Sequence, residues 1–127
     1  VQLTLTQKTL IDGAVVVSTP QDMALADARR AVTLFAKTGI EVLGVVENMA
    51  WFSAPDGSEI EIFGRGGARA MAGALNVPFL GEIPLDPRLR QGSDSGTPLT
   101  AAEPKGPMAE RFAAIARQVA QALDKSN

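Results

Sequence analysis

Residues 14–39 read AVVVSTPQDMALADARRAVTLFAKTG, and this stretch decides the fold class. It begins with an unbroken run of apolar, β-branched residues, which is typical of a strand covered on both faces, as in a parallel sheet. Thr19, Pro20 and Asp22 then stand at the cap, first-turn and capping-box positions of a helix. Apolar residues recur at helical spacing, and Gly39 is placed to end the helix in a left-handed conformation. A strand followed directly by a helix predicts a crossover unit of an α/β fold.

The same alternation continues along the chain. Residues 41–47 and 77–83 are apolar runs that predict a second and a third buried strand, and residues 68–75 between them predict a short Ala-rich helix. Residues 58–63 alternate Ile with Glu and predict a half-exposed strand in a hairpin or at an edge. Right-handed crossovers then place the three buried strands in one sheet. The predicted fold class is α/β, with three α/β/α layers and a largely parallel sheet.

The two ends of the chain are less regular in pattern. Residues 87–107 are rich in Pro, Gly, Ser and Thr, so we expect a surface crossing there, preceded by a helical turn near Arg88. Residues 108–124 carry apolar side chains every three or four positions and predict a terminal amphipathic helix over one face of the sheet. Residues 1–10 fit either a strand or a helix.

Composition excludes several kinds of chemistry. The 127 residues include 12 basic and 14 acidic side chains but no Cys, His or Tyr, so the chain has no disulfide, Cys/His zinc site, thiol nucleophile or Ser-His-Asp triad. The net charge of −2 argues against a nucleic-acid surface. No apolar run reaches the length of a membrane span, so we expect a cytoplasmic protein with no membrane partner. The length suits one domain, and the start at Val1 indicates a piece of a longer protein.

Candidate ligand-binding residues follow the second and third apolar runs, because ligands of open α/β sheets bind at the carboxyl ends of strands. They are Asn48, Met49, Pro84, Leu85 and Asp86. An Asn amide both donates and accepts hydrogen bonds, as reading the edge of an adenine ring requires. The alternative is that Asn48 and Asp86 cap the next turn or helix. Because no carboxylates are paired for metal binding or acid–base work, we predict no catalytic and no metal-binding residues.

Three further features have simpler interpretations. Residues 64–67 (GRGG) look like a phosphate loop but lack the Lys-Ser/Thr that follows in a Walker A motif, which favours a tight turn packed against a helix. Arg65 and Arg69 are expected on solvated helix faces. Trp51 is expected to anchor the core, with a subunit interface as the alternative.

Several uncommon strings, taken in order, resemble those of the Mrp/ApbC family of P-loop ATPases, relatives of MinD and ParA implicated in carrying iron–sulfur clusters. The resemblance extends to about Pro107, through VQLTLTQ, DGAVVVSTPQDMALADARRAVTLF, GIEVLGVVENMAWF, EIFGRGGARA and VPFLGEIPLDPRLRQGSDSGTP. It implies a deviant Walker fold that binds ATP and Mg, forms a homodimer with ATP at the interface, and serves iron–sulfur client proteins. Residues 1–127 would then be the C-terminal portion of one such domain, whose phosphate-binding loop lies upstream, and would be inactive alone.

The resemblance also assigns roles to individual positions. Asn48 matches the Asn that contacts adenine, residues 84–86 match the loop that borders the base, and residues 19–21 lie beside the nucleotide and the dimer interface. It favours a helix for residues 1–10. Many members carry C-P-x-C where this chain has Ala54-Pro-Asp-Gly57, so we expect no iron–sulfur cluster on this motif. The alternatives are a MinD/ParA-like positioning ATPase and a non-catalytic interaction module.

Overall fold

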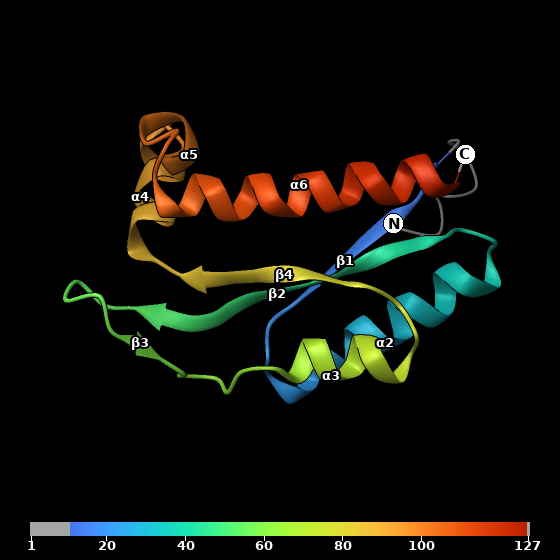
Figure 1. The fold of residues 1–127 in the computed structure, drawn as a ribbon. Coiled ribbons are helices and arrows are strands. Elements are labelled where there is room, and N and C mark those ends of the chain that lie inside the picture. Colours follow the sequence, from blue (N-terminus) through green and yellow to red (C-terminus); the bar gives the residue numbers. More distant parts are fainter. Residues whose placement is uncertain (1–10, 127) are drawn as a thin grey trace.

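The computed structural model describes residues 11–126, which form an open sheet with helices on both faces (Figure 1). The interpretation of residues 1–10 lies outside this range. In chain order the elements are β1 (Ala14–Ser18), α2 (Asp22–Lys37), β2 (Val42–Ser53), β3 (Glu59–Ile60), α3 (Gly67–Ala74), β4 (Phe79–Leu85), α4 (Pro87–Ser95), α5 (Leu99–Ala102) and α6 (Pro107–Ser126).

The long strand β2 is the centre of the sheet. It pairs in parallel with β1 through residues such as Val45 and in parallel with β4 on its other edge. The short strand β3 returns antiparallel to the end of β2, where Phe52 pairs with Ile60. The predicted parallel sheet and hairpin are confirmed, although β3 covers only two of the six residues expected. Because β1, β2 and β4 run the same way, their carboxyl ends meet at one edge of the sheet.

Two apolar clusters bind the layers together. Below the sheet in Figure 1, α2 and α3 pack on β1 and β2 around Val32, Val45 and Met71. Above it, α6 lies along β4 and β2, and Leu80, Ile83 and Met108 belong to one buried cluster there. Val45 is completely buried because helices cover the sheet on both sides. The predicted three-layer α/β/α arrangement is therefore the fold.

Helix α2 ends as expected but begins differently. Gly39 has a φ of +77° just beyond the helix, as the sequence predicts. The prediction of Thr19 as cap and Pro20 as first residue is wrong. Gln21 is the capping residue, in an extended conformation and with no side-chain cap, and the Thr19 hydroxyl donates to its Oε1 at 3.1 Å. The extended backbone at Gln21 delays the helix to Asp22.

Residues 87–107 hold two short helices: the helical turn expected near Arg88 is confirmed within α4, whereas α5 forms where the prolines argued against a helix. Pro87 is the first residue of α4, Pro98 precedes α5, and Pro107 begins α6. Proline is well tolerated at a helix start, because the N–H it lacks has no partner there anyway. The prolines thus divide the segment into helices instead of preventing them. No helix within residues 11–126 is long and apolar enough to cross a membrane.

Candidate functional site

Asn48 lies where the sequence predicts a ligand-binding amide, near the carboxyl end of the parallel part of β2. It pairs with Ile83 of β4. Its side chain is half-buried and lines a cavity of about 670 Å³ between the sheet and the helices α4, α5 and α6. The walls are mainly apolar, with Val17, Ile83 and Leu99 among them. An apolar cavity with one polar amide is the usual make-up of a small-molecule site.

The Asn48 side chain makes one hydrogen bond within the described residues. Its Oδ1 accepts from the backbone N–H of Met49 at 3.0 Å. Met49 has a φ of +54°, the left-handed region that a side chain rarely adopts, and strand pairing is irregular between Asn48 and Phe52. An amide oxygen has a second lone pair and the amide nitrogen carries two hydrogens, so the group keeps capacity for a ligand. Asn48 and Met49 both lie inside β2, so the alternative that Asn48 caps a following turn or helix is wrong, and its side chain lines the cavity.

Pro84 and Leu85 are strand residues, whereas the sequence indicated a loop beyond β4. Pro84 is buried, and Leu85 pairs with Phe52. Asp86 directly follows β4 and caps α4. Its carboxylate accepts from the backbone N–H of Arg88 at 2.9 Å and from the Arg88 guanidinium at 2.9 Å. Hydrogen bonding by Arg88 lowers the pKa of Asp86 against the opposing effect of burial. The alternative interpretation, in which Asp86 caps the next helix, is therefore confirmed.

Asp86 faces a second cavity, separate from the one lined by Asn48. This cavity of about 460 Å³ lies between the start of α4 and the turn after β2, and both Ala54 and Gly57 line it. The turn is closed by the Gly57 N–H, which donates to the Ala54 oxygen at 3.0 Å. Ser58 donates to Asp56 from its hydroxyl and its N–H, and these bonds lower the Asp56 pKa. The structure therefore brings the C-P-x-C-equivalent turn next to residues 86–88.

The glycine-rich segment at residues 64–67 binds a carboxylate of the chain itself. Glu47 is completely buried, and its two carboxylate oxygens accept from the N–H groups of Gly66 at 3.1 Å and Ala68 at 2.8 Å. Gly66, with a φ of +91°, provides the tight turn that aims these amides. The positive end of α3 stabilises the negative charge. Because Glu47 occupies these donors, the expectation of a structural turn is preferred over a phosphate site.

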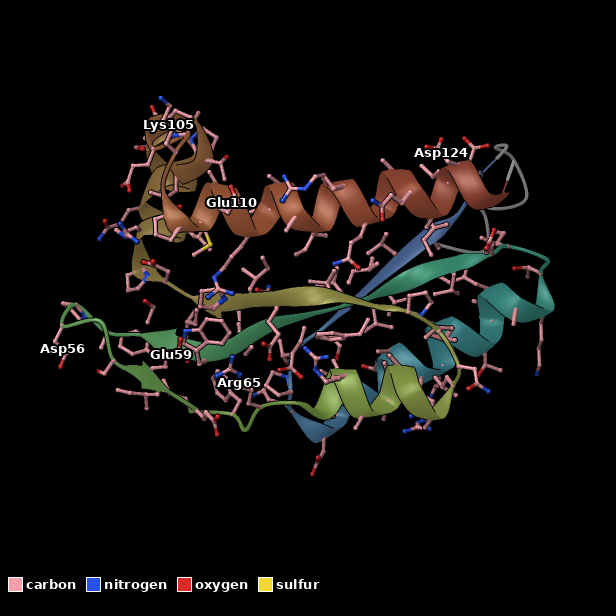
Figure 2. The ribbon with its side chains drawn as sticks, viewed as in Figure 1. Asp56, Glu59, Arg65, Lys105, Glu110 and Asp124 are labelled. Atoms are coloured by element: carbon pink, nitrogen blue, oxygen red, sulfur yellow. The ribbon has the colours of Figure 1, made fainter. Side chains whose placement is uncertain are left out.

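Arg65 is exposed, as expected, but it precedes α3 instead of lying on a helix face, and its side chain is part of a polar network. Its guanidinium donates twice to Glu82 of β4, at 3.1 Å each, and to Glu59 of β3 at 3.0 Å. These carboxylates raise the pKa of Arg65 still further above its ordinary value. The guanidinium also lies 4.2 Å from the centre of the Trp51 ring. In Figure 2, Arg65 and Glu59 lie at the carboxyl end of the sheet.

Trp51 is a core residue, as expected, with only 3% of its surface exposed. A second guanidinium, that of Arg111 on α6, lies 4.6 Å from its ring centre. Sequence patterns miss this arrangement, because Arg65, Arg111 and Trp51 come from three separate elements. They also miss the cavity walls supplied by Pro98, Leu99 and Thr100. The one signal in this part of the sequence is Leu99, an apolar residue among polar neighbours, which indicates a buried position.

Metal-binding groups are not found in the part of the chain that the structure describes. No group of three or more His, Cys, Asp or Glu side chains could hold a metal ion there. The full sequence has no Cys and no His. Carboxylate and amide oxygens favour hard cations, whereas iron–sulfur clusters require softer sulfur or imidazole ligands.

Comparison with known proteins decides the family. The family model described as "ParA: NUBPL iron-transfer P-loop NTPase" matches residues 1–120. The chain belongs to this family. Among its relatives, the iron–sulfur cluster carrier protein of Deinococcus radiodurans is 50% identical over 121 residues, covering 94% of this chain and 34% of the relative. The iron–sulfur cluster transfer protein NUBPL of Dictyostelium discoideum is 41% identical over 126 residues, covering 98% and 39%.

Two solved structures share the fold of this chain. A nucleotide-binding protein from Archaeoglobus fulgidus, in complex with ADP, has a TM-score of 0.69 and 38% identity, covering 87% of this chain and 44% of its own. The cell division ATPase MinD of Pyrococcus furiosus has a TM-score of 0.66 and 25% identity, covering 87% and 43%. The chain thus spans 34–39% of the length of these curated relatives and less than half of these structures.

Proposed function

We propose that residues 1–127 form the adenine-side part of an ATP-binding carrier of iron–sulfur clusters. The observation that carries the proposal is the position of Asn48, an amide at the edge of a mainly apolar cavity near the carboxyl end of the central strand. The likeness to the Archaeoglobus fulgidus protein in complex with ADP supports a nucleotide as the ligand. We also propose that Met49 and residues 84–86 border the base, although they do not line this cavity and Asp86 lines the second one.

The residues present fit a purine base. Apolar walls such as Ile83 and Leu99 would remove the faces of a flat ring from water, and the Asn48 amide would pair with its polar edge. Asn48 donates and accepts at once, as the amino group and ring nitrogen of adenine require. Pro84 is buried inside β4, so it would act through the shape of the strand end and not as an open stacking surface.

The described residues do not fit the phosphates or their Mg ion. The one glycine-rich segment that precedes a helix donates its amides to Glu47, and no acidic cluster is available for a cation among residues 11–126. We therefore propose that the chain is the C-terminal portion of one P-loop ATPase domain. Within the described range β1 pairs only with β2, and Val17 is 60% exposed, which leaves both an edge and a face for further structure.

Cluster carriage is proposed for the complete protein, with a restriction from this chain. Ala54 and Gly57 replace the two thiols of C-P-x-C, and the chain has no Cys or His at all. Any cluster must therefore be held by ligands from outside these 127 residues. We further propose that the complete protein is a cytoplasmic homodimer that serves iron–sulfur client proteins. The carrier and transfer names of the relatives support the clients.

A MinD-like positioning ATPase is the second candidate, because the Pyrococcus furiosus MinD structure resembles this fold at 25% identity. Anaerobic reconstitution of the full-length protein with iron and sulfide separates the two. A carrier retains iron and sulfide after desalting and releases them to an apo-ferredoxin. A protein that retains no iron yet still binds ATP supports the positioning candidate.

The nucleotide site is tested by Asn48→Ala in the full-length protein, with ADP titrated by calorimetry. Loss of hydrogen bonds to a buried ligand is expected to weaken ADP binding by about 1–3 kcal/mol. Gln121→Ala is the matched control, since this amide is exposed and lines a cavity at the opposite end of the sheet. An unchanged dissociation constant in the Asn48 variant would reject the adenine assignment.

A further inference from the structure

The segment of β2 that links Asn48 to the C-P-x-C-equivalent turn is not held by regular strand pairing. Asn48 pairs with Ile83 and Phe52 pairs with Leu85, so β2 takes four residue steps where β4 takes two. Met49 adopts its left-handed conformation inside this irregular segment. Bulges of this kind redirect side chains and are frequent next to functional sites. Contacts other than the strand ladder must therefore fix the position of residues 49–51.

Trp51 is the residue of this segment whose surroundings are most fully defined. It is buried, and the guanidinium groups of Arg65 and Arg111 lie 4.2 and 4.6 Å from its ring centre. Cations over an indole ring attract its electron-rich faces, most strongly where water is excluded. The two arginines belong to different layers, because Arg65 precedes α3 and Arg111 lies on α6. The ring is thus tied to both sides of the sheet.

Arg65 is itself held firmly enough to hold Trp51. Its guanidinium is bound in a fork by both Glu82 oxygens and also by Glu59, and Glu82 is only 16% exposed. A planar guanidinium in a two-point contact has a defined orientation, unlike a lysine ammonium. Next to it in the chain, Gly66 is fixed by Glu47. The loop before α3 is therefore a rigid support at the carboxyl end of β2.

We propose that Arg65 and Arg111 are positioning residues for the nucleotide site: by fixing Trp51 they set the irregular segment of β2 that carries Asn48 and Met49. The inference rests on the proposed adenine contact of Asn48. Neither arginine lines the cavity that Asn48 lines, so both act through the strand. The same segment leads into the turn at Ala54, which lines the cavity shared with Asp86. The contacts of Arg65 and Arg111 with Trp51 therefore also link that turn to the nucleotide end of the sheet.

The test uses the full-length protein with Arg65→Gln and Arg111→Gln, which remove the charge from either contact with Trp51. Two measurements are made on each variant: ADP affinity by calorimetry, and hydrogen exchange of the amides at residues 48–53. We expect ADP binding to weaken about three- to tenfold and exchange over this segment to rise in both variants. If one variant fails to fold, the other carries the test, because it belongs to a different element.

Matched controls are provided by two arginines close in sequence to Arg65 and Arg111. Arg69→Gln in α3 loses a comparable ring contact, 4.4 Å from the centre of Phe79, and Arg117→Gln in α6 loses an exposed pair with Glu110. Both are expected to keep wild-type ADP affinity.

The outcomes separate this inference from the proposed function. Faster exchange at residues 48–53 with unchanged ADP affinity in the Arg65 and Arg111 variants overturns the positioning role. Equal weakening in the Arg69 and Arg117 controls also overturns it, since the effect would then be general. If Asn48→Ala weakens ADP binding but Arg65→Gln and Arg111→Gln do not, only the positioning role of the two arginines fails. If Asn48→Ala has no effect, the proposed adenine contact itself fails.

Discussion

The Oε1 atom of Glu47 lies 2.8 Å from the backbone nitrogen of Ala68, so a completely buried carboxylate caps the first turn of α3 from inside the protein. Its second oxygen accepts from Gly66. Buried ionised groups are tolerated only when they are fully hydrogen-bonded, and here amides at the positive end of a helix provide the bonds. The contact joins the central strand to the loop that carries Arg65.

Glu47→Gln is expected to destabilise the protein by about 1–3 kcal/mol, because the amide presents N–H groups to backbone donors and lacks the charge that the helix end stabilises. Urea unfolding measures the change in the free energy of unfolding. Glu61→Gln, an exposed site, is the control and should change stability by less than about 0.5 kcal/mol. Equal stability of both variants would contradict the buried cap.

The ion pair of Asp86 with Arg88 predicts a specific pH dependence. Since the folded-state pKa of Asp86 is lowered, its contribution is complete above the ordinary unfolded value of about 3.9 and is lost as pH falls through the folded value. Asp86→Asn keeps a capping side chain but cannot titrate. The wild type should therefore be more stable than Asp86→Asn at pH 6. The difference should be only about 1 kcal/mol, because Arg88 is half exposed, and it should shrink below pH 4.

Urea unfolding of both proteins between about pH 2.5 and pH 6 measures this difference. A difference that stays constant over the whole range would show that the carboxylate does not titrate with a lowered pKa.

Gly44 in β2 allows a close approach of the chain before β4. A Cβ atom there would lie 2.5 Å from Leu80 Cγ and 2.8 Å from the backbone oxygen of Pro78, which cannot move aside without distorting the sheet. Gly44→Ala is expected to cost about 1–3 kcal/mol. Gly73→Ala is the control with opposite sign, because α3 has open space at that position and alanine favours helix. Thermal unfolding compares the two; similar Tm values would contradict the steric argument.

The turn at residues 54–57 predicts a gain of iron binding. Ala54 and Gly57 are joined by the 3.0 Å hydrogen bond across the turn, so cysteines at both positions would present two thiols close together. After anaerobic reconstitution, Ala54→Cys/Gly57→Cys is expected to retain more iron and sulfide than the wild type, because thiolates are the ligands that clusters require. Cysteine at position 57, where φ is +88°, should cost about 1–2 kcal/mol.

Ala54→Cys alone is the control for this experiment. It should retain no more iron than the wild type, as one thiol per chain is too few. If the double variant also retains none while remaining folded, the turn does not present its two ends in a chelating arrangement.

Much of the fold could be predicted because its signals are local. The β-branched run at residues 14–18 and the helical spacing after Asp22 each depend on a few neighbouring side chains, and both elements form. Gly39 ends α2 for the same reason. The starts of helices were predicted less well: Thr19 was expected to cap α2, but the backbone stays extended to Gln21. Pro98 and Pro107 were interpreted as helix breakers, whereas Pro98 immediately precedes α5 and Pro107 begins α6.

The sequence by itself determined the fold class, the family resemblance and the absence of thiol and imidazole ligands, because these follow from local pattern and composition. Only the tertiary structure decided what the polar groups do. It turned the glycine loop toward Glu47, placed Arg65 and Arg111 on Trp51, and used Asp86 as a cap. These contacts join residues from separate elements, and their partners are fixed only when the layers pack, so no local pattern could specify them.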